Sequence, residues 1–192
     1  MENKIIFKWL GCNEETDEFV IIKYELQQLK WLVLNITTFL AISEILFGAE
    51  YGIIFLVSFV PIRRMAGGYH ADTRWNCYLV SNIIYIINLI LIKKSVLNMT
   101  NMIVCSIITG FLIVFLAPID NKNNRLKRNE KKVIKQKCIK AVVVGEIVMI
   151  IAYLMRINII FQTIFWDLIT VLALQLVGII KNFSDINDIK AI

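Results

Sequence analysis

The chain has 192 residues, of which 58% are hydrophobic, with a mean hydropathy of +0.68 and a formal net charge of +6. A soluble globular domain is roughly 45–50% apolar even when glycine is counted, so this composition argues against that class. Two prolines and eight glycines are too few for a disordered chain. The apolar residues gather in long runs, which indicates an all-α, polytopic membrane protein with one integral membrane domain over residues 1–192.

The N-terminal residues lack a secretory pattern, so we expect no cleaved signal peptide. From Thr16 to Lys30, apolar residues recur at helical spacing: Phe19, Ile22, Leu26 and Leu29. This pattern predicts either an amphipathic helix at the membrane interface or a cytoplasmic extension of the first span. We therefore assign residues 1–30 to a cytoplasmic or interfacial segment.

About six apolar segments follow along the chain. They are Trp31–Phe47, Tyr51–Ile62, Tyr78–Ile92, Met102–Ile119, Ala141–Met155 and Thr163–Ile180. A perpendicular span needs about 20 apolar residues, and the second and third segments fall well short of that length. The sequence is compatible with six membrane segments, some short or re-entrant, and with four full spans plus two partly inserted segments.

The distribution of Lys and Arg predicts the orientation in the membrane. Residues 120–140 hold nine basic residues, which places this loop in the cytoplasm by the positive-inside rule. Counting spans from this loop puts Arg63, Arg64 and both termini on the same side. Only the pair Lys93 and Lys94 disagrees with this topology.

The polar segment Pro61–Cys77, reading PIRRMAGGYHADTRWNC, contains the only histidine, His70, and the thiol of Cys77. A cysteine nucleophile needs a base or a positive field to form a thiolate near neutral pH. Residues seven apart on a straight helix lie ~10.5 Å apart at ~1.5 Å rise per residue, which is too far for an imidazole to reach the sulfur. The segment must therefore bend between His70 and Cys77.

The residues between them provide that bend. Gly67 and Gly68 break a helix that continues from the second apolar segment. Asp72 or Thr73 can then cap a new helix that enters the third segment. This places Cys77 in the first turns of the new helix, where the helix dipole favours a thiolate.

We expect no metal ion or cofactor. The chain has one histidine and four separated cysteines without a CxxC pair, which argues against a Cys/His zinc site.

The local pattern closely resembles the signature of the AgrB family (accessory gene regulator protein B). The matching residues are Arg63-Arg64, Ala66-Gly67-Gly68-Tyr69-His70-Ala71 and Cys77-Tyr78. The length, the apolar segments, the basic loop and a Lys23-Tyr24-Glu25-Leu26 segment also fit. The resemblance implies a membrane cysteine endopeptidase of bacterial peptide quorum sensing.

The resemblance also implies the reaction. Cys77 would be the nucleophile and His70 the general base and acid, at the cytoplasmic face of the bacterial cell membrane. An AgrD-like propeptide would lose its C-terminal tail and form an acyl-enzyme thioester, which ring closure to a thiolactone or lactone would resolve. The resemblance further implies a homodimer. The alternatives are a small membrane exporter of a peptide without protease chemistry, and a non-enzymatic scaffold.

Supporting roles are open in the sequence. Arg63 or Arg64 can bind an acidic tail or stabilise an oxyanion, or act as positive-inside anchors. Gly67 and Gly68 supply backbone geometry and potential N–H donors. The basic loop, with Lys131 and Lys132, can set topology and bind anionic lipids or the propeptide tail. Nothing in the pattern suggests nucleic-acid binding, and no third catalytic residue is identifiable.

Overall fold

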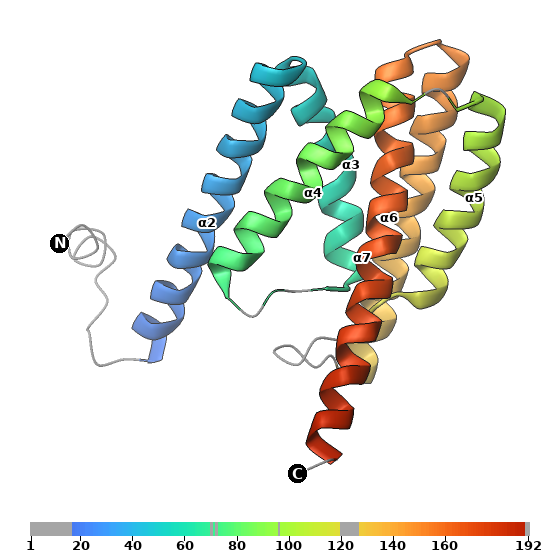
Figure 1. Cartoon of the computed structure of the whole chain (residues 1–192). Coiled ribbons are helices and arrows are strands. Elements are labelled where there is room, and N and C mark those ends of the chain that lie inside the picture. The colour runs from blue at the N-terminus through green and yellow to red at the C-terminus, as the bar shows by residue number, and fades with distance from the viewer. Residues whose placement is uncertain (1–16, 70, 72, 96, 120–126, 191–192) are drawn as a thin grey trace. The chain divides into compact units, whose positions relative to one another are not determined.

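The computed structural model describes residues 17–69, 71, 73–95, 97–119 and 127–190. It contains the helices α2 (Asp17–Leu46), α3 (Ala49–Ala66), α4 (Arg74–Lys94), α5 (Met99–Leu116), α6 (Arg128–Leu154) and α7 (Asn158–Lys190) (Figure 1). Within these described ranges no residue belongs to a β-strand. The predicted all-α class is confirmed.

Four helical stretches are long and apolar enough to cross a membrane: Leu26–Leu46, Arg74–Lys94, Met99–Leu116 and Asn158–Ser184. The third predicted segment, which was short in the sequence, gains length because α4 extends beyond it at both ends. The helix α3 carries Glu50, Arg63 and Arg64 within its 18 residues, and charged residues also interrupt α6. Among the six predicted segments, those in α3 and α6 are therefore the ones that do not qualify as spans.

The chain divides into two compact units, residues 1–38 and 39–192. The described part of the first unit is the N-terminal portion of α2, which runs unbroken through Lys30 into the first span. The backbone thus agrees with the predicted extension of that span. Hydroxyls of Thr37 and Thr38 donate to the carbonyls of Val33 and Leu34 at 2.9 and 2.7 Å, which satisfies these polar groups within the helix.

In the second unit, α7 packs against α3, α4, α5 and α6. Figure 1 shows α5, α6 and α7 running side by side. Phe161 and Leu168 of α7 are fully buried, and they belong to a core cluster with Met149 of α6 and Ile113 of α5. The helix α7 is therefore the central element around which this unit is assembled.

A smaller aromatic cluster lies where the C-terminal part of α2 meets α3 and α4. Its ring centroids are 4.5 Å apart for Phe39 and Tyr85, and 4.6 Å apart for Phe55 and Tyr85. All three rings are buried. Stacked and tilted rings at this separation add specific attraction to the burial of their area.

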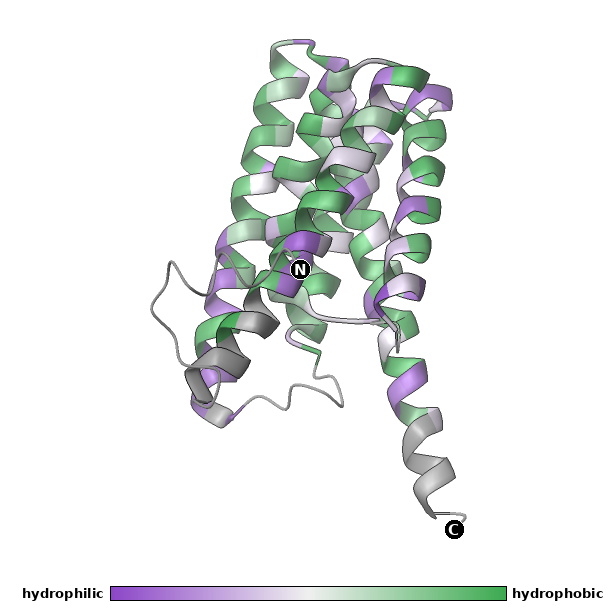
Figure 2. Cartoon of the chain, turned by 90° about the vertical axis from the view of Figure 1, so that its left-hand side faces the viewer, coloured by the Kyte–Doolittle hydropathy of each residue, from purple (hydrophilic) through white to green (hydrophobic). Residues whose placement is uncertain are grey.

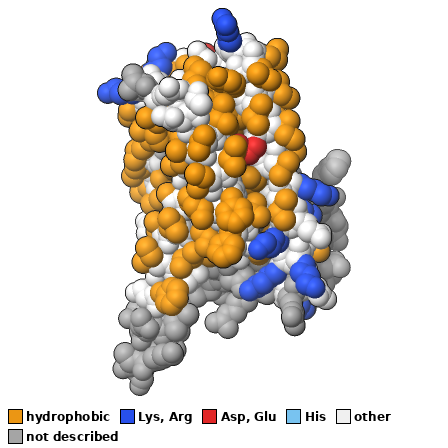
Figure 3. Space-filling model, turned by 90° about the vertical axis from the view of Figure 1, so that its right-hand side faces the viewer, with side chains coloured by type: hydrophobic (Ala, Val, Ile, Leu, Met, Phe, Trp, Pro, Cys, Tyr) orange, Lys and Arg blue, Asp and Glu red, His pale blue; other side chains and the backbone are white. Residues whose placement is uncertain are grey.

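Hydrophobic residues dominate the helices (Figure 2), and many large apolar side chains are exposed. Val57, Phe111 and Phe115 are 70%, 69% and 68% exposed. Figure 3 shows a face covered largely by hydrophobic side chains, with Lys and Arg side chains toward both of its ends. A surface of this kind is compatible with lipid and would promote aggregation in water. Together with the four long apolar helices, it identifies a membrane protein.

Two predicted loop boundaries need correction. Of the segment predicted as a loop over residues 61–77, helix α3 takes the residues up to Ala66 and α4 takes those from Arg74 onward. Helix α6 begins at Arg128, so the second half of the predicted 120–140 loop is helical. The reason is the same in both cases: the apolar pattern ends before the helix does, and the helical backbone continues into the polar flank.

We expect Phe161→Ala to destabilise the bundle by about 3–5 kcal/mol, because it leaves a cavity in the core around α7. Phe111→Ala is the matched control, since the Phe111 ring is exposed to the surroundings of the helices. Thermal unfolding in detergent measures both variants. Equal melting temperatures for Phe161→Ala and Phe111→Ala would contradict the central position of α7.

Candidate active site

The α3 helix ends at a pair of glycines, as the sequence predicts. Gly67 has φ +73° and Gly68 has φ +118°, a region that residues with a side chain rarely adopt. A Cβ atom at Gly67 would lie 2.4 Å from the carbonyl oxygen of Ile119, which follows α5. Residues 67 and 119 form an isolated parallel bridge, and the Ile119 amide donates to the Ala66 carbonyl at 3.1 Å. Both backbone angle and space therefore require glycine at position 67.

The α4 helix begins at Arg74 and is capped by Thr73, one of the two predicted caps. The Thr73 hydroxyl oxygen accepts a hydrogen bond from the Asn76 amide at 3.2 Å, and the Cys77 amide donates to the Thr73 carbonyl at 3.0 Å. Cys77 thus lies at the end of the first turn, where the positive end of the helix dipole is close. Its thiol is free and exposed.

His70 and Asp72 lie outside the described residues. The contact between His70 and Cys77 therefore stays a prediction. Tyr69, directly before His70, is described, and so is the whole first turn of α4 that carries Cys77.

Arg63, in the last turn of α3, turns back over the segment that leads to His70. Its guanidinium donates to the carbonyl oxygens of both Gly67 and Tyr69. Burial lowers the pKa of Arg63 from its ordinary value, and the negative charge of a Cys77 thiolate opposes that shift. Arginine stays protonated in proteins, so Arg63 places a permanent positive charge within electrostatic reach of the Cys77 sulfur.

Arg64, the next residue, has an exposed side chain. The sequence offers Arg63 and Arg64 as equivalent candidates, and the structure separates them. Arg63 holds the segment between α3 and α4, whereas Arg64 faces the surroundings.

Helix α7 provides a support for this segment that the sequence analysis missed. The Tyr69 amide donates to the Leu174 carbonyl at 2.9 Å. The side chain of Gln175 is fully buried, and its Nε2 donates to the carbonyls of Ala66 at 3.2 Å and Ile113 at 3.3 Å. The sequence did contain a signal for Gln175: its amide side chain stands within an apolar run. Polar residues inside membrane segments are functional candidates by default.

Lys131 and Lys132 lie in the first turns of α6, on a helix and not on a loop. In the first turn of that helix, the Glu130 carboxylate accepts from the Lys127 amide at 2.9 Å. No three His, Cys, Asp or Glu side chains within the described part of the chain gather in a way that could hold a metal ion.

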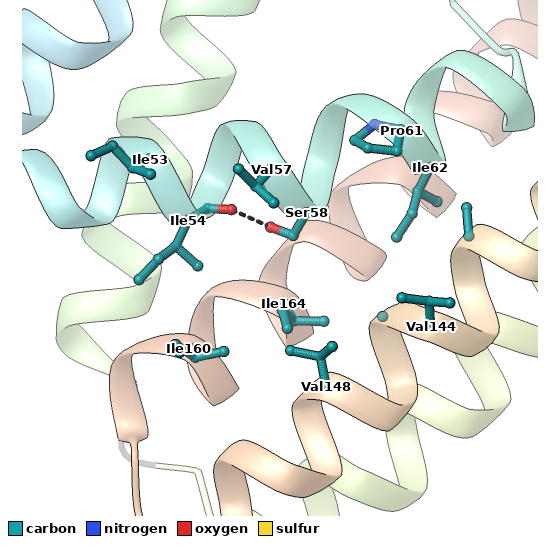
Figure 4. A pocket seen from close by; sticks show the side chains of 12 residues that line it. Ile53, Ile54, Val57, Ser58, Pro61, Ile62, Val144, Val148, Ile160 and Ile164 are labelled. Atoms are coloured by element: carbon teal, nitrogen blue, oxygen red, sulfur yellow. Dashed lines mark hydrogen bonds between the residues drawn. The ribbon is translucent and has the colours of Figure 1, made fainter.

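A cavity of about 380 Å³ lies between α3, α6 and α7 (Figure 4). Its lining is aliphatic apart from Ser58, and the Ser58 hydroxyl donates to the Ile54 carbonyl at 2.7 Å. The lining contains no titratable side chain and does not include Cys77. The cavity suits an apolar occupant and is not the site of the thiol chemistry.

Comparisons with known proteins agree with the motif. The family model of accessory gene regulator B matches residues 3–179. The chain is 26% identical over 152 residues to a Clostridium perfringens (strain 13 / Type A) protein named "Putative AgrB-like protein 1", covering 75% of this chain and 80% of that relative. It is 30% identical over 127 residues to "Putative AgrB-like protein 2" of the same organism, covering 62% and 59%. No solved structure matches.

The free thiols should differ sharply in their reaction with iodoacetamide. Burial raises the pKa of Cys138 to about 11, with nearby Lys135 opposing the shift, whereas Cys77 is exposed. At pH 8 only about one Cys138 thiol in a thousand is then ionised, and only the thiolate reacts. Peptide mapping should find Cys77 modified first and Cys138 modified only as the pH approaches 11. Equal rates at pH 8 would contradict this assignment.

The two adjacent arginines form a matched pair of test positions. Arg63→Gln removes a charged donor from the Gly67 and Tyr69 carbonyls, so we expect a loss of about 1.5–3 kcal/mol per bond and faster proteolysis between residues 67 and 73. Arg64→Gln should stay within about 0.5 kcal/mol of wild type, as for most surface changes. Thermal unfolding and limited proteolysis measure both effects. Indistinguishable variants would show that Arg63 does not hold this segment.

Proposed function

Because the chain belongs to the accessory gene regulator B family, we propose that it is a membrane cysteine endopeptidase that matures a quorum-sensing peptide. Membership in this family supports a role in peptide quorum sensing of the accessory gene regulator type. One observation carries the catalytic part of the proposal. The exposed thiol of Cys77 lies at the positive end of α4, within electrostatic reach of Arg63, which also holds the chain that leads to His70.

In this proposal Cys77 is the nucleophile and His70 is the general base and acid. His70 takes the thiol proton, and the Cys77 sulfur attacks the scissile carbonyl carbon of an AgrD-like propeptide. The tetrahedral intermediate collapses when His70 returns the proton to the leaving amine, and the C–N bond breaks. The C-terminal tail departs and the rest of the propeptide is held as a thioester on Cys77.

Ring closure then needs no further source of energy. A cysteine or serine of the bound propeptide gives its proton to His70 and attacks the thioester carbonyl. The C–S bond to Cys77 then breaks, and the departing thiolate takes that proton from His70. Exchange of a thioester for a thiolactone or lactone retains an activated acyl group, which an amide alone does not provide. Partial exclusion of water at the membrane boundary protects the thioester from hydrolysis.

The supporting groups take different roles. Arg63 already donates to two carbonyls, so its contribution is a fixed positive charge near the sulfur and a stable loop. The Gly67 amide donates to the Arg63 carbonyl at 3.3 Å, which removes it as an oxyanion donor. Arg64 and Lys132 are exposed, and we assign them, with Lys131, to contacts with an acidic propeptide tail or with anionic lipids.

The proposed topology places this site at the cytoplasmic face of the bacterial cell membrane, where a newly made propeptide is accessible. Residues 120–140 carry the largest group of basic residues, and the positive-inside rule puts both termini on the same side. We include a homodimer in the proposal because the family resemblance implies one.

Coexpression with a candidate propeptide, followed by mass spectrometry of the products, tests the reaction. Cys77→Ala and His70→Ala should abolish release of the C-terminal tail, because each removes a group that changes bonding in the reaction. Cys105→Ala is the control, since Cys105 is another exposed free thiol that lies within α5.

Tail release by Cys77→Ala would overturn the protease assignment. Secretion of an uncleaved peptide that depends on the wild-type chain would instead favour the exporter alternative. Normal cyclisation by Cys77→Ser would overturn the role of the thioester.

A further inference from the structure

The segment that leads to His70 rests directly on the backbone of α7. A Cβ atom at Gly178 would lie 2.5 Å from both the Gly68 carbonyl carbon and the Tyr69 amide nitrogen. A Cβ atom at Gly68 would lie 2.7 Å from the Leu174 carbonyl oxygen, at a φ of +118°. The obstructing atoms are backbone atoms and cannot rotate away. Glycines on both sides are therefore needed for this approach.

This approach allows an unusual hydrogen bond. In an α-helix, the carbonyl of residue 174 already accepts from the amide of residue 178. The Tyr69 amide reaches the same carbonyl at 2.9 Å, and it does so beside Gly178, where no side chain covers the helix. The chain next to His70 is thus fixed to α7 by its own backbone.

Gln175 fixes the start of the same segment. Its Nε2 donates to the Ala66 carbonyl at the end of α3 and to the Ile113 carbonyl in α5. The Ala66 carbonyl also accepts from the Ile119 amide at 3.1 Å. One buried side chain therefore joins the ends of α3 and α5 to α7, in an environment where an unpaired amide is costly.

We propose that Leu174–Gly178 of α7 forms a platform that positions the His70-bearing segment relative to Cys77, with Gln175 and Gly178 as its positioning residues. Helix α4, which carries Cys77, packs against α7 as well. The chain directly before His70 and the helix that carries Cys77 therefore both contact α7. The inference rests on the proposed cysteine protease function. It adds two positioning residues on α7, a helix far along the chain from His70 and Cys77.

The main test is Gly178→Ala in the full-length protein. The added methyl group displaces Gly68 and Tyr69, and a shift of about 1 Å at a reacting pair costs on the order of 100-fold in rate. We expect kcat for propeptide cleavage to fall by that factor, with KM little changed. Gly145→Ala is the matched control, because the nearest atom to its Cβ is Ile62 Cδ1 at 3.5 Å, an ordinary contact.

Gln175→Met provides a second variant that keeps the side-chain volume but removes the donor. We expect its kcat to fall about tenfold, the equivalent of one net hydrogen bond. If the melting temperature of Gly178→Ala shows that this variant does not fold, the kcat of Gln175→Met tests the platform.

A third measurement separates positioning from general damage. In the wild-type protein, His70→Ala should slow alkylation of Cys77. In the Gly178→Ala background, His70→Ala should have no further effect on that rate, while Cys105 is labelled as in wild type. An undiminished effect of His70→Ala in folded Gly178→Ala protein would show that the platform does not position the pair.

The outcomes distinguish this inference from the proposed function. Wild-type cleavage by both Gly178→Ala and Gln175→Met, together with an inactive Cys77→Ala protein, would overturn the platform and leave the protease assignment intact. Cleavage by Cys77→Ala would overturn the protease assignment itself.

Discussion

A chain that leaves a helix inside an apolar bundle must still satisfy its backbone carbonyls and amides, because lipid supplies no partners. The end of α3 meets this requirement with groups from three places. The Ala66 carbonyl accepts from Ile119 and Gln175, and the carbonyls of Gly67 and Tyr69 accept from Arg63. The same bonds that make the helix break tolerable also determine where the chain toward His70 runs. The path of the chain at the candidate site thus follows from the need to satisfy buried backbone polar groups.

Polar pairs hold the bundle together elsewhere as well. Asn88 of α4 donates to Thr170 of α7 at 2.9 Å, and Ser106 of α5 donates to Glu146 of α6 at 3.0 Å. Between helices in lipid there is little hydrophobic driving force, so packing and such hydrogen bonds provide the attraction. Helix α7 takes part in the first of these contacts and also supports the candidate site. Stability and site geometry therefore depend on the same helix.

The sequence was sufficient to predict those features of the site that depend on backbone preferences of neighbouring residues. The helix break at Gly67 and Gly68 and the cap at Thr73 follow from backbone preferences within a few residues, and the structure has both. The difference between Arg63 and Arg64 was not predictable, because it depends on which face of α3 packs inward. Gln175 was missed for a related reason: its partners lie 109 and 62 residues away along the chain. Contacts of that separation leave no periodic pattern in a single sequence.

The place of the Gly178 contact in the chain has a consequence for biosynthesis. A ribosome makes the protein from its N-terminus, so His70 and Cys77 are synthesised well before α7. A nascent chain that ends before residue 174 carries both reactive residues without the Leu174 carbonyl on which the Tyr69 amide is fixed. On our proposal, the thiol acts only slowly on peptides until α7 has been made. Order of synthesis would then protect the cell from a premature protease.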